Sequence, residues 1–225
     1  YGRRATEHFA RELAKMGATI VSGMARGIDS IAGITAIKTG GKTVAVLGSG
    51  LDVIYPPEHA GLYQSIRKNG VVITEYPPGT RPKRENFPRR NRIMAGLSYG
   101  ILVTQAPEKS GALITANYAV ENGRDLFVVP SDIFNIHSVG SNRLIRQGAK
   151  AVMTAEDITG EYPYIKVTPL SEKIAKTIAR DKLKELDLTA LNDLQVQIVK
   201  ALNNEPMTSD EISRHTGVAS FEVNS

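Results

Sequence analysis

The strongest candidate for chemistry in this sequence is a basic segment, RPKRENFPRRNRIMAG, which spans residues 81–96. Its six cationic side chains surround one aromatic residue, Phe87, and stand against a single acid, Glu85, so six minus one gives the segment a net charge of +5. Concentrated cations of this kind usually meet polyanions, because binding releases the polyanion's condensed counterions. A solvated loop with chance clustering is the alternative, and composition alone leaves the two interpretations equal. The six cations are Arg81, Lys83, Arg84, Arg89, Arg90 and Arg92.

The aromatic residue of this segment lies next to a predicted helix start. Residues 90–92, Arg-Asn-Arg, follow Pro88, so their side chains are expected to fan out from one end of a helix. An exposed ring beside guanidinium groups is typical of a platform on which single-strand bases stack while cations hold the phosphates. The alternative is that Phe87 belongs to the core and that one of the arginines pairs with Glu75 or Glu85.

Two glycine-containing turns are further candidates for anion binding, because each places backbone N–H groups at a strand-to-helix junction. VSGMARGID puts Ser22 and Gly23 at one turn, where Arg26 adds a full charge, and KSGALITAN puts Ser110 and Gly111 at the other. Turns on the same edge of one sheet could hold successive phosphates. The alternatives are a tight turn that needs glycine for packing and an ordinary helix N-cap by Ser110.

Residues that would point to an enzyme, a metal site or a nucleotide cofactor are weak in this sequence. No nucleophile has a base beside it, and the acids near strand ends, Asp29, Asp52 and Glu75, occupy positions typical of turns and helix starts. The four His are scattered and there is no Cys, so we predict no metal site. LGSG lacks the third glycine of the dinucleotide fingerprint and GGKT precedes a strand, so we predict no cofactor.

Composition bounds the class of protein. The chain has 225 residues, of which 41% are hydrophobic, enough for one main domain and a small appendage. It contains no apolar run of about 18 residues and no basic-then-apolar leader, so neither a membrane span nor a secretory signal is predicted. The lack of Cys fits a reducing compartment, and we expect a cytoplasmic protein.

The elements that must position these residues alternate along residues 1–158. Apolar strands that alternate with helices predict parallel strands joined by right-handed crossovers, with helices on both faces. The predicted fold class is therefore α/β, with a doubly wound, mostly parallel Rossmann-like sheet. Because the chain opens on a helix, we expect a leading strand before Tyr1. The predicted strands are 18–23, 43–50, 71–79, 99–106 and 125–130, and the predicted helices are 3–16, 27–41, 59–70, 89–98 and 110–123.

The amino-acid composition of the chain changes after residue 158. Residues 159–187 are rich in charge and Pro and are predicted to form a linker with some helix. Residues 188–225 read as helix, turn, helix, turn and the start of a third helix, with capping-box spacing between Thr208 and Glu211. We interpret this small all-α segment as part of a winged-helix domain.

Six motifs, in order, resemble the bacterial DNA-processing protein A family (DprA or Smf) over residues 1–158. They are SGMARGID, LGSGLDVIYP, TEYPPGT, NFPRRNRIMAGLS, SGALITA and GSNRLIRQGA. The resemblance implies a cytoplasmic homodimer with a Rossmann-like domain that binds single-stranded DNA. It further implies a mediator that protects this DNA and loads the recombinase RecA onto it, as in natural transformation and competence, and that catalyses no reaction itself.

The resemblance also implies which residues contact DNA. In the family the pocket uses a basic residue three before an aromatic one, followed by an arginine-asparagine motif, with the Ser-Gly turn nearby. A Gly-Ser/Thr-Arg loop is expected just before Tyr1. Together with the first glycine turn, the predicted single-strand contacts are Arg84, Phe87, Arg90, Asn91, Arg92, Ser110, Gly111, Ser22, Gly23 and Arg26.

The rival class is an enzyme of the same Rossmann-like superfamily, a nucleotide-cleaving phosphoribohydrolase. Such enzymes carry a Pro-Gly-Gly-x-Gly-Thr loop followed by a catalytic Glu. Here APEKSGALITA occupies that place, which disfavours this alternative.

Overall fold

The computed structural model of the chain describes residues 1–165, 169–170 and 212–214. The chain divides into two compact units, Tyr1–Val167 and Thr168–Ser225. The predicted winged-helix segment, 188–225, lies outside the described residues apart from 212–214.

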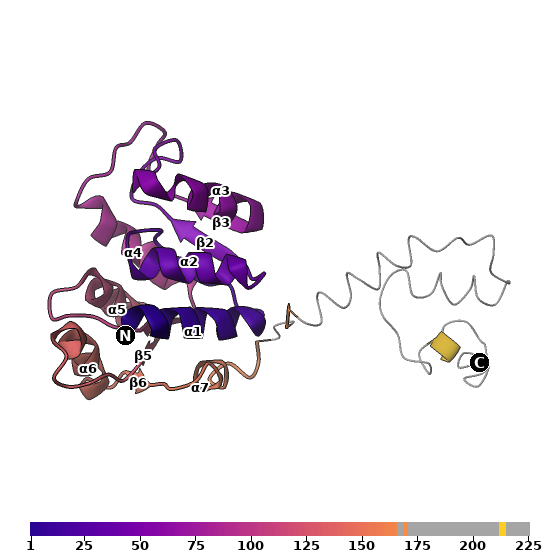
Figure 1. Ribbon diagram of the computed structural model, residues 1–225, viewed down its shortest axis with the longest axis vertical. Helices are drawn as coiled ribbons and strands as arrows, with labels where there is room; N and C mark the ends of the chain where they lie inside the picture. Colours follow the sequence, from indigo (N-terminus) through magenta and orange to yellow (C-terminus); the bar gives the residue numbers. More distant parts are fainter. Residues whose placement is uncertain (166–168, 171–211, 215–225) are drawn as a thin grey trace. The chain divides into compact units, whose positions relative to one another are not determined.

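The first unit alternates helices and strands along its length (Figure 1). The prediction of an α/β class is therefore confirmed. The structure also contains α6 (Val139–Arg146), β6 (Lys150–Ala151) and α7 (Glu156–Thr159), which the sequence analysis did not predict. The strands are β1 (Ile20–Ser22), β2 (Thr43–Val46), β3 (Gly70–Ile73), β4 (Gly100–Val103), β5 (Asp125–Val128) and β6 (Lys150–Ala151). The helices are α1 (Gly2–Lys15), α2 (Ile28–Lys38), η1 (Pro57–His59), α3 (Ala60–Asn69), α4 (Asn86–Leu97), α5 (Gly111–Glu121), η2 (Ile136–Ser138), α6 (Val139–Arg146) and α7 (Glu156–Thr159).

All strand pairs are parallel, as the alternation of strands and helices predicts, but they form two sheets of three strands. One sheet has the order β1-β2-β3, with Ile20 opposite Thr43 and Thr43 opposite Gly70. The other has the order β4-β5-β6, with Gly100 opposite Asp125. The predicted single sheet thus appears as two halves, each built by crossovers that advance one strand at a time.

Within residues 1–165, the two sheets are joined by packed helices and not by hydrogen bonds between their strands. α1 and α2 run side by side at the front of the molecule in Figure 1, and α1 also packs on β1. Thr6 of α1 forms a buried 2.8 Å hydroxyl-to-hydroxyl hydrogen bond with Thr104, directly after β4. α4 packs on β1 and β2 and also on α5, which covers β4. The helices thereby hold the carboxyl ends of both sheets in one region.

Buried apolar side chains form three clusters in the first unit. A large apolar side chain contributes about 2 kcal/mol when it is fully buried, so these clusters fix the strand ends that carry the candidate site. Residues 159–165, which the sequence assigns to a linker, begin within this packing: the Tyr162 ring lies 6.3 Å from that of Phe127, and its hydroxyl donates to Asp125. The clusters are Phe9, Phe127, Val129, Val152 and Ile158; Met24, Ala45, Leu47, Tyr63 and Ile66; and Val103, Ala106, Ala116, Val128 and Leu144.

No helix in the described part of the chain combines the length and the apolar composition that crossing a bilayer requires.

Candidate nucleic-acid interface

The helix that carries four of the ten predicted contacts, α4, begins at Asn86, earlier than the predicted start at residue 89. Pro88 is tolerated because it lies in the first turn, where backbone N–H groups have no partner within the helix. The buried Asn86 side chain donates a 2.9 Å hydrogen bond to the carbonyl oxygen of Gly48, after β2. This anchor was missed by sequence reasoning, although Asn is common at helix starts.

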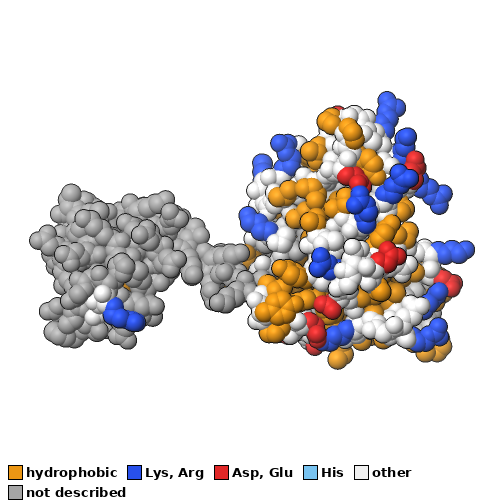
Figure 2. Space-filling view, turned by 180° about the vertical axis from the view of Figure 1, so that it is seen from behind, with side chains coloured by type: hydrophobic (Ala, Val, Ile, Leu, Met, Phe, Trp, Pro, Cys, Tyr) orange, Lys and Arg blue, Asp and Glu red, His pale blue; other side chains and the backbone are white. Residues whose placement is uncertain are grey.

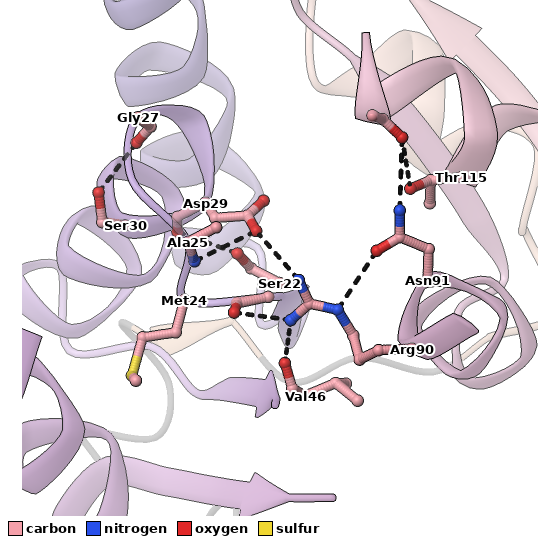
Figure 3. Close-up of polar contacts among 12 residues, drawn as sticks. Ser22, Met24, Ala25, Gly27, Asp29, Ser30, Val46, Arg90, Asn91 and Thr115 are labelled. Carbon is pink, nitrogen blue, oxygen red and sulfur yellow. Dashed lines mark hydrogen bonds and ion pairs between the residues drawn. The ribbon is translucent and has the colours of Figure 1, made fainter. Parts of the chain in front are cut away.

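Arg90 points into the molecule, so the prediction that it fans outward from the helix start is wrong. Only 2% of the residue is exposed. Its Nη1 donates to the carbonyl oxygens of Gly23, at 2.7 Å, and Val46, and its Nη2 lies 3.9 Å from Oδ2 of Asp29 (Figure 3). Burial lowers the pKa of the guanidinium group, an effect that the Asp29 carboxylate opposes. Arg90 therefore joins the ends of β1 and β2 and offers no surface to a ligand.

The first glycine turn is shaped to receive this guanidinium group. A Cβ atom on Gly23 would lie 2.3 Å from Nη1 of Arg90, so no other residue fits there without displacing Arg90. The buried Ser22 hydroxyl donates to the Asp29 carbonyl oxygen at 2.9 Å. Ser22 and Gly23 thus correspond to the alternative interpretation, a tight turn that needs glycine for packing, and the turn presents its Gly23 carbonyl to a cation.

Asn91 also faces inward and extends the network toward α5. Its Oδ1 accepts a 3.2 Å hydrogen bond from Nε of Arg90, and its Nδ2 donates to the Gly111 carbonyl oxygen at 3.4 Å. Thr115, one turn into α5, donates to the same carbonyl (Figure 3). The run from Asp29 through Arg90 and Asn91 to Gly111 links three of the motif segments into one rigid support.

The second glycine turn is an ordinary helix start. The Ser110 hydroxyl accepts a 3.2 Å hydrogen bond from the Ala112 backbone N–H, which is the N-cap arrangement. Gly111 is exposed, and a Cβ atom added to it would meet nothing within 4 Å. Open space therefore adjoins this turn on its outer side.

A group of cations lies on the outside of this support, in the segment between β3 and α4 and in the first turn of α4. Figure 2 shows Lys and Arg side chains gathered at the upper right of the described domain, on the side where this segment lies. Among the described residues none of these cations forms an ion pair. The exposed residues are Arg81, Lys83, Arg84 and Arg89, which we call the outer cations.

The two other predicted cations have acidic partners. The exposed Arg92 side chain pairs with Glu75, as the alternative interpretation of the basic segment anticipates. Arg26 pairs with Glu58, with 2.6 Å between Nε and Oε1, and this hydrogen bond lowers the pKa of Glu58. Both pairs lie at the surface, where such interactions contribute little and are readily exchanged.

Phe87, in the first turn of α4, lies beside the buried support. It is half-buried and is absent from the three core clusters. Its ring centroid lies 5.6 Å from that of Tyr55 and 5.9 Å from Cζ of Arg90. It also approaches the backbone at Gly48, where a Cβ atom would lie 3.2 Å from the ring.

The loop that carries the outer cations is fixed at its start. Both carboxylate oxygens of Asp52 accept hydrogen bonds from the Gly79 backbone N–H, at 2.8 and 2.9 Å. The Gly50 N–H donates to the Thr80 carbonyl oxygen at 3.0 Å. Asp52, like Asp29, therefore serves a structural contact near a strand end.

Comparisons with known proteins place the chain among DNA processing proteins. The model of the family described as DNA recombination-mediator protein A matches residues 1–163. The chain is 44% identical over 163 residues to the DNA processing protein DprA of Bacillus subtilis (strain 168), covering 72% of this chain and 55% of that protein. The chain thus spans about half the length of this relative.

Two solved structures resemble the first unit. DNA processing protein A from Streptococcus pneumoniae has a TM-score of 0.67 at 42% identity, over 71% of this chain and 56% of that one. DNA processing protein A from Helicobacter pylori has a TM-score of 0.65 at 34% identity, over 72% and 73%. The latter structure is described as giving insight into a unique single-stranded DNA binding mode.

Proposed function

Because the chain belongs to the DNA recombination-mediator protein A family, we propose that it binds single-stranded DNA and protects it while the recombinase RecA is loaded. The single-stranded DNA binding described for the Helicobacter pylori relative supports the first step. We extend the proposal to a cytoplasmic homodimer, as the resemblance implies. The observation that carries the proposal is the partly exposed Phe87 ring, with the outer cations before and after it in sequence, at the carboxyl ends of β1–β3, the edge where ligands bind in parallel sheets. Within the part of the chain that the structure describes, these cations form no ion pair.

The proposed interface has two layers with different tasks. The outer cations and Phe87 supply the groups that touch DNA, since phosphates attract exposed cations and bases stack on rings. The inner layer, Arg90 with Asn91, holds the loops after β1 and β2 at a fixed distance from α4 and α5. A fixed support reduces the entropy that binding would otherwise cost.

Fluorescence anisotropy with labelled oligonucleotides tests the proposed binding. Stacking and phosphate contacts do not read base edges, so oligothymidylate and mixed-sequence strands are expected to bind within about tenfold of each other, and duplex DNA more weakly. A clear consensus sequence from a selection experiment would contradict this.

Arg84→Ala is expected to weaken single-strand binding and to flatten its dependence on salt. Each lost phosphate contact lowers the slope of log K against log salt by roughly 0.7. Folding stability is expected to change little, because the Arg84 side chain is exposed. Arg11→Ala is the matched control, because it removes the same charge from the groove between α1 and α2. Reduced affinity with an unchanged slope would mean that Arg84 does not touch phosphate.

We propose that the site binds without catalysing a reaction. Asp29 faces the buried Arg90 and Asp52 accepts hydrogen bonds from the Gly79 backbone, so both acids serve the fold. Glu75 pairs with the exposed Arg92, and APEKSGALITA stands where the phosphoribohydrolases carry their catalytic loop. Incubation with nucleoside monophosphates is therefore expected to release no free base. Release of base that is abolished by substituting one of these acids would establish the phosphoribohydrolase alternative.

RecA loading is tested separately from binding. RecA hydrolyses ATP when it assembles on single-stranded DNA, so the chain is expected to shorten the lag before hydrolysis on DNA coated with single-strand binding protein. An unchanged lag at concentrations that saturate DNA binding would restrict the function to binding.

A further inference from the structure

Tyr55 is an exposed aromatic residue that the sequence analysis did not single out. It follows Ile54, which packs against the second core cluster, whereas Tyr55 turns outward and is 36% exposed. Its ring centroid lies 5.6 Å from that of Phe87, and the two ring planes are tilted by 48°. Two aromatic rings thus stand side by side at the edge where the outer cations gather.

A cation accompanies each of these rings. Cζ of Arg90 lies 5.9 Å from the Phe87 centroid, and because Arg90 is buried it approaches that ring from inside the molecule. Cζ of Arg26 lies 5.7 Å from the Tyr55 centroid, and Arg26 is exposed. Its partner Glu58 is also exposed, so a DNA phosphate can replace this carboxylate at small cost. An aromatic ring with a cation beside it is complementary to a nucleotide, because the ring can stack on the base while the cation contacts the phosphate.

We propose that Tyr55 and Phe87 form a two-ring platform that holds two successive bases of a single strand, with Arg26 at the phosphate beside the Tyr55 base. This inference rests on the proposed single-strand binding and goes beyond it by adding Tyr55 as a second stacking residue. Bases that stack on rings tilted by 48° cannot stay parallel to each other, so the step between them must open. A single strand opens a step at low cost, whereas a duplex must lose stacking and pairing, and the platform therefore selects against duplex DNA.

The competing interpretation is that Tyr55 only supports Phe87. The two roles differ in how the effects of substitution combine. If each ring holds its own base, removing both rings reduces affinity further than removing Phe87 alone, although the contact between the rings makes the two losses not strictly multiplicative. If Tyr55 acts only through Phe87, its removal has no further effect once Phe87 is gone.

The experiment is a double-mutant cycle on the full chain, with a labelled oligothymidylate as the probe. Tyr55→Ala and Phe87→Ala are each expected to reduce affinity by roughly 5- to 100-fold. The double variant is expected to bind clearly more weakly than Phe87→Ala alone. Tyr55→Phe, which keeps the ring, is expected to bind like the parent chain. Tyr55→Leu keeps apolar volume without a π-face and is expected to lose affinity as Tyr55→Ala does, which guards against a folding defect in the alanine variant. Tyr55→Ala is also expected to reduce the ratio of the affinity for single-stranded DNA to the affinity for duplex DNA.

The cycle distinguishes the two-ring platform from the interpretation in which Tyr55 only supports Phe87. A double variant no weaker than Phe87→Ala alone, or a Tyr55→Leu variant that binds like the parent chain, would overturn the two-ring platform and leave single-strand binding intact. A parent chain that binds no single-stranded DNA would overturn the proposed function and this inference with it.

Discussion

Replacing Arg90 with Ala is expected to lower the free energy of unfolding of the first unit by about 3 kcal/mol, more than any substitution of an outer cation. The guanidinium group satisfies the carbonyls of Gly23 and Val46 in a buried position and faces the Asp29 carboxylate. Its removal leaves these acceptors without their donor and opens a space under α4. Because Asp29 is partly exposed, water can reach its carboxylate once Arg90 is removed. We therefore expect a loss of stability at the lower end of the roughly 3 to 5 kcal/mol that breaking a buried ion pair costs.

Urea denaturation followed by tyrosine fluorescence measures this change. All eight Tyr lie between residues 1 and 164, within the first unit, and the chain has no Trp, so the signal reports on this unit alone. Arg92→Ala is the matched control and is expected to change stability by less than about 0.5 kcal/mol, because its ion pair lies at the surface. Arg90→Lys is not expected to rescue stability, since a single ammonium group cannot reproduce the fork of contacts. Equal stability of Arg90→Ala and Arg92→Ala would contradict the proposed support.

DNA binding separates this role from direct contact. Where the Arg90→Ala variant remains folded, its affinity for single-stranded DNA is expected to fall with an unchanged salt slope, because a buried guanidinium releases no counterion from phosphate. Arg84→Ala is expected to show the opposite pattern, a changed slope with unchanged stability.

The sequence predicts the fold class well but cannot tell which arginines face inward. Hydropathy marks apolar strands, and their alternation with helices suffices to predict parallel pairing. The buried face of α4, however, mixes Asn86, Arg90 and Asn91 with Met94 and Ala95, so no apolar periodicity reveals it. The partners that make burial of Arg90 favourable, Gly23 and Val46, lie 67 and 44 residues away in sequence. Only the tertiary structure brings them to the guanidinium group.

The same reason explains why Tyr55 was missed. Its significance comes from the neighbouring Phe87 ring, which lies in the first turn of α4 and is separated from Tyr55 in sequence by α3 and β3. The outer cations, by contrast, lie within nine residues of one another in sequence, from Arg81 to Arg89, and are recognised without tertiary information. The residue type therefore predicts which side chains are able to contact DNA, whereas the tertiary contacts of each side chain determine which of them are available for that contact.

Phe87→Ala is expected to cost about 1 to 3 kcal/mol of single-strand binding free energy, because the variant loses a ring on which a base can stack. The accompanying loss of folding stability is expected to be below the roughly 3 to 5 kcal/mol of a fully buried Phe, since Phe87 is only half-buried and lies outside the three core clusters. Phe87→Tyr keeps the π-face and is expected to bind nearly as well as the parent chain.

Phe87→Leu is the variant that separates stacking from packing. Leucine fills part of the space beside Tyr55 and Gly48 but has no π-face, so we expect near-parental stability together with a loss of affinity close to that of Phe87→Ala. Thermal unfolding and anisotropy titrations on the same samples measure both quantities. If Phe87→Leu bound DNA like the parent chain, or if Phe87→Ala lowered the melting temperature sharply while retaining normal affinity below it, Phe87 would be a packing residue and the interface a purely electrostatic clamp made by the outer cations.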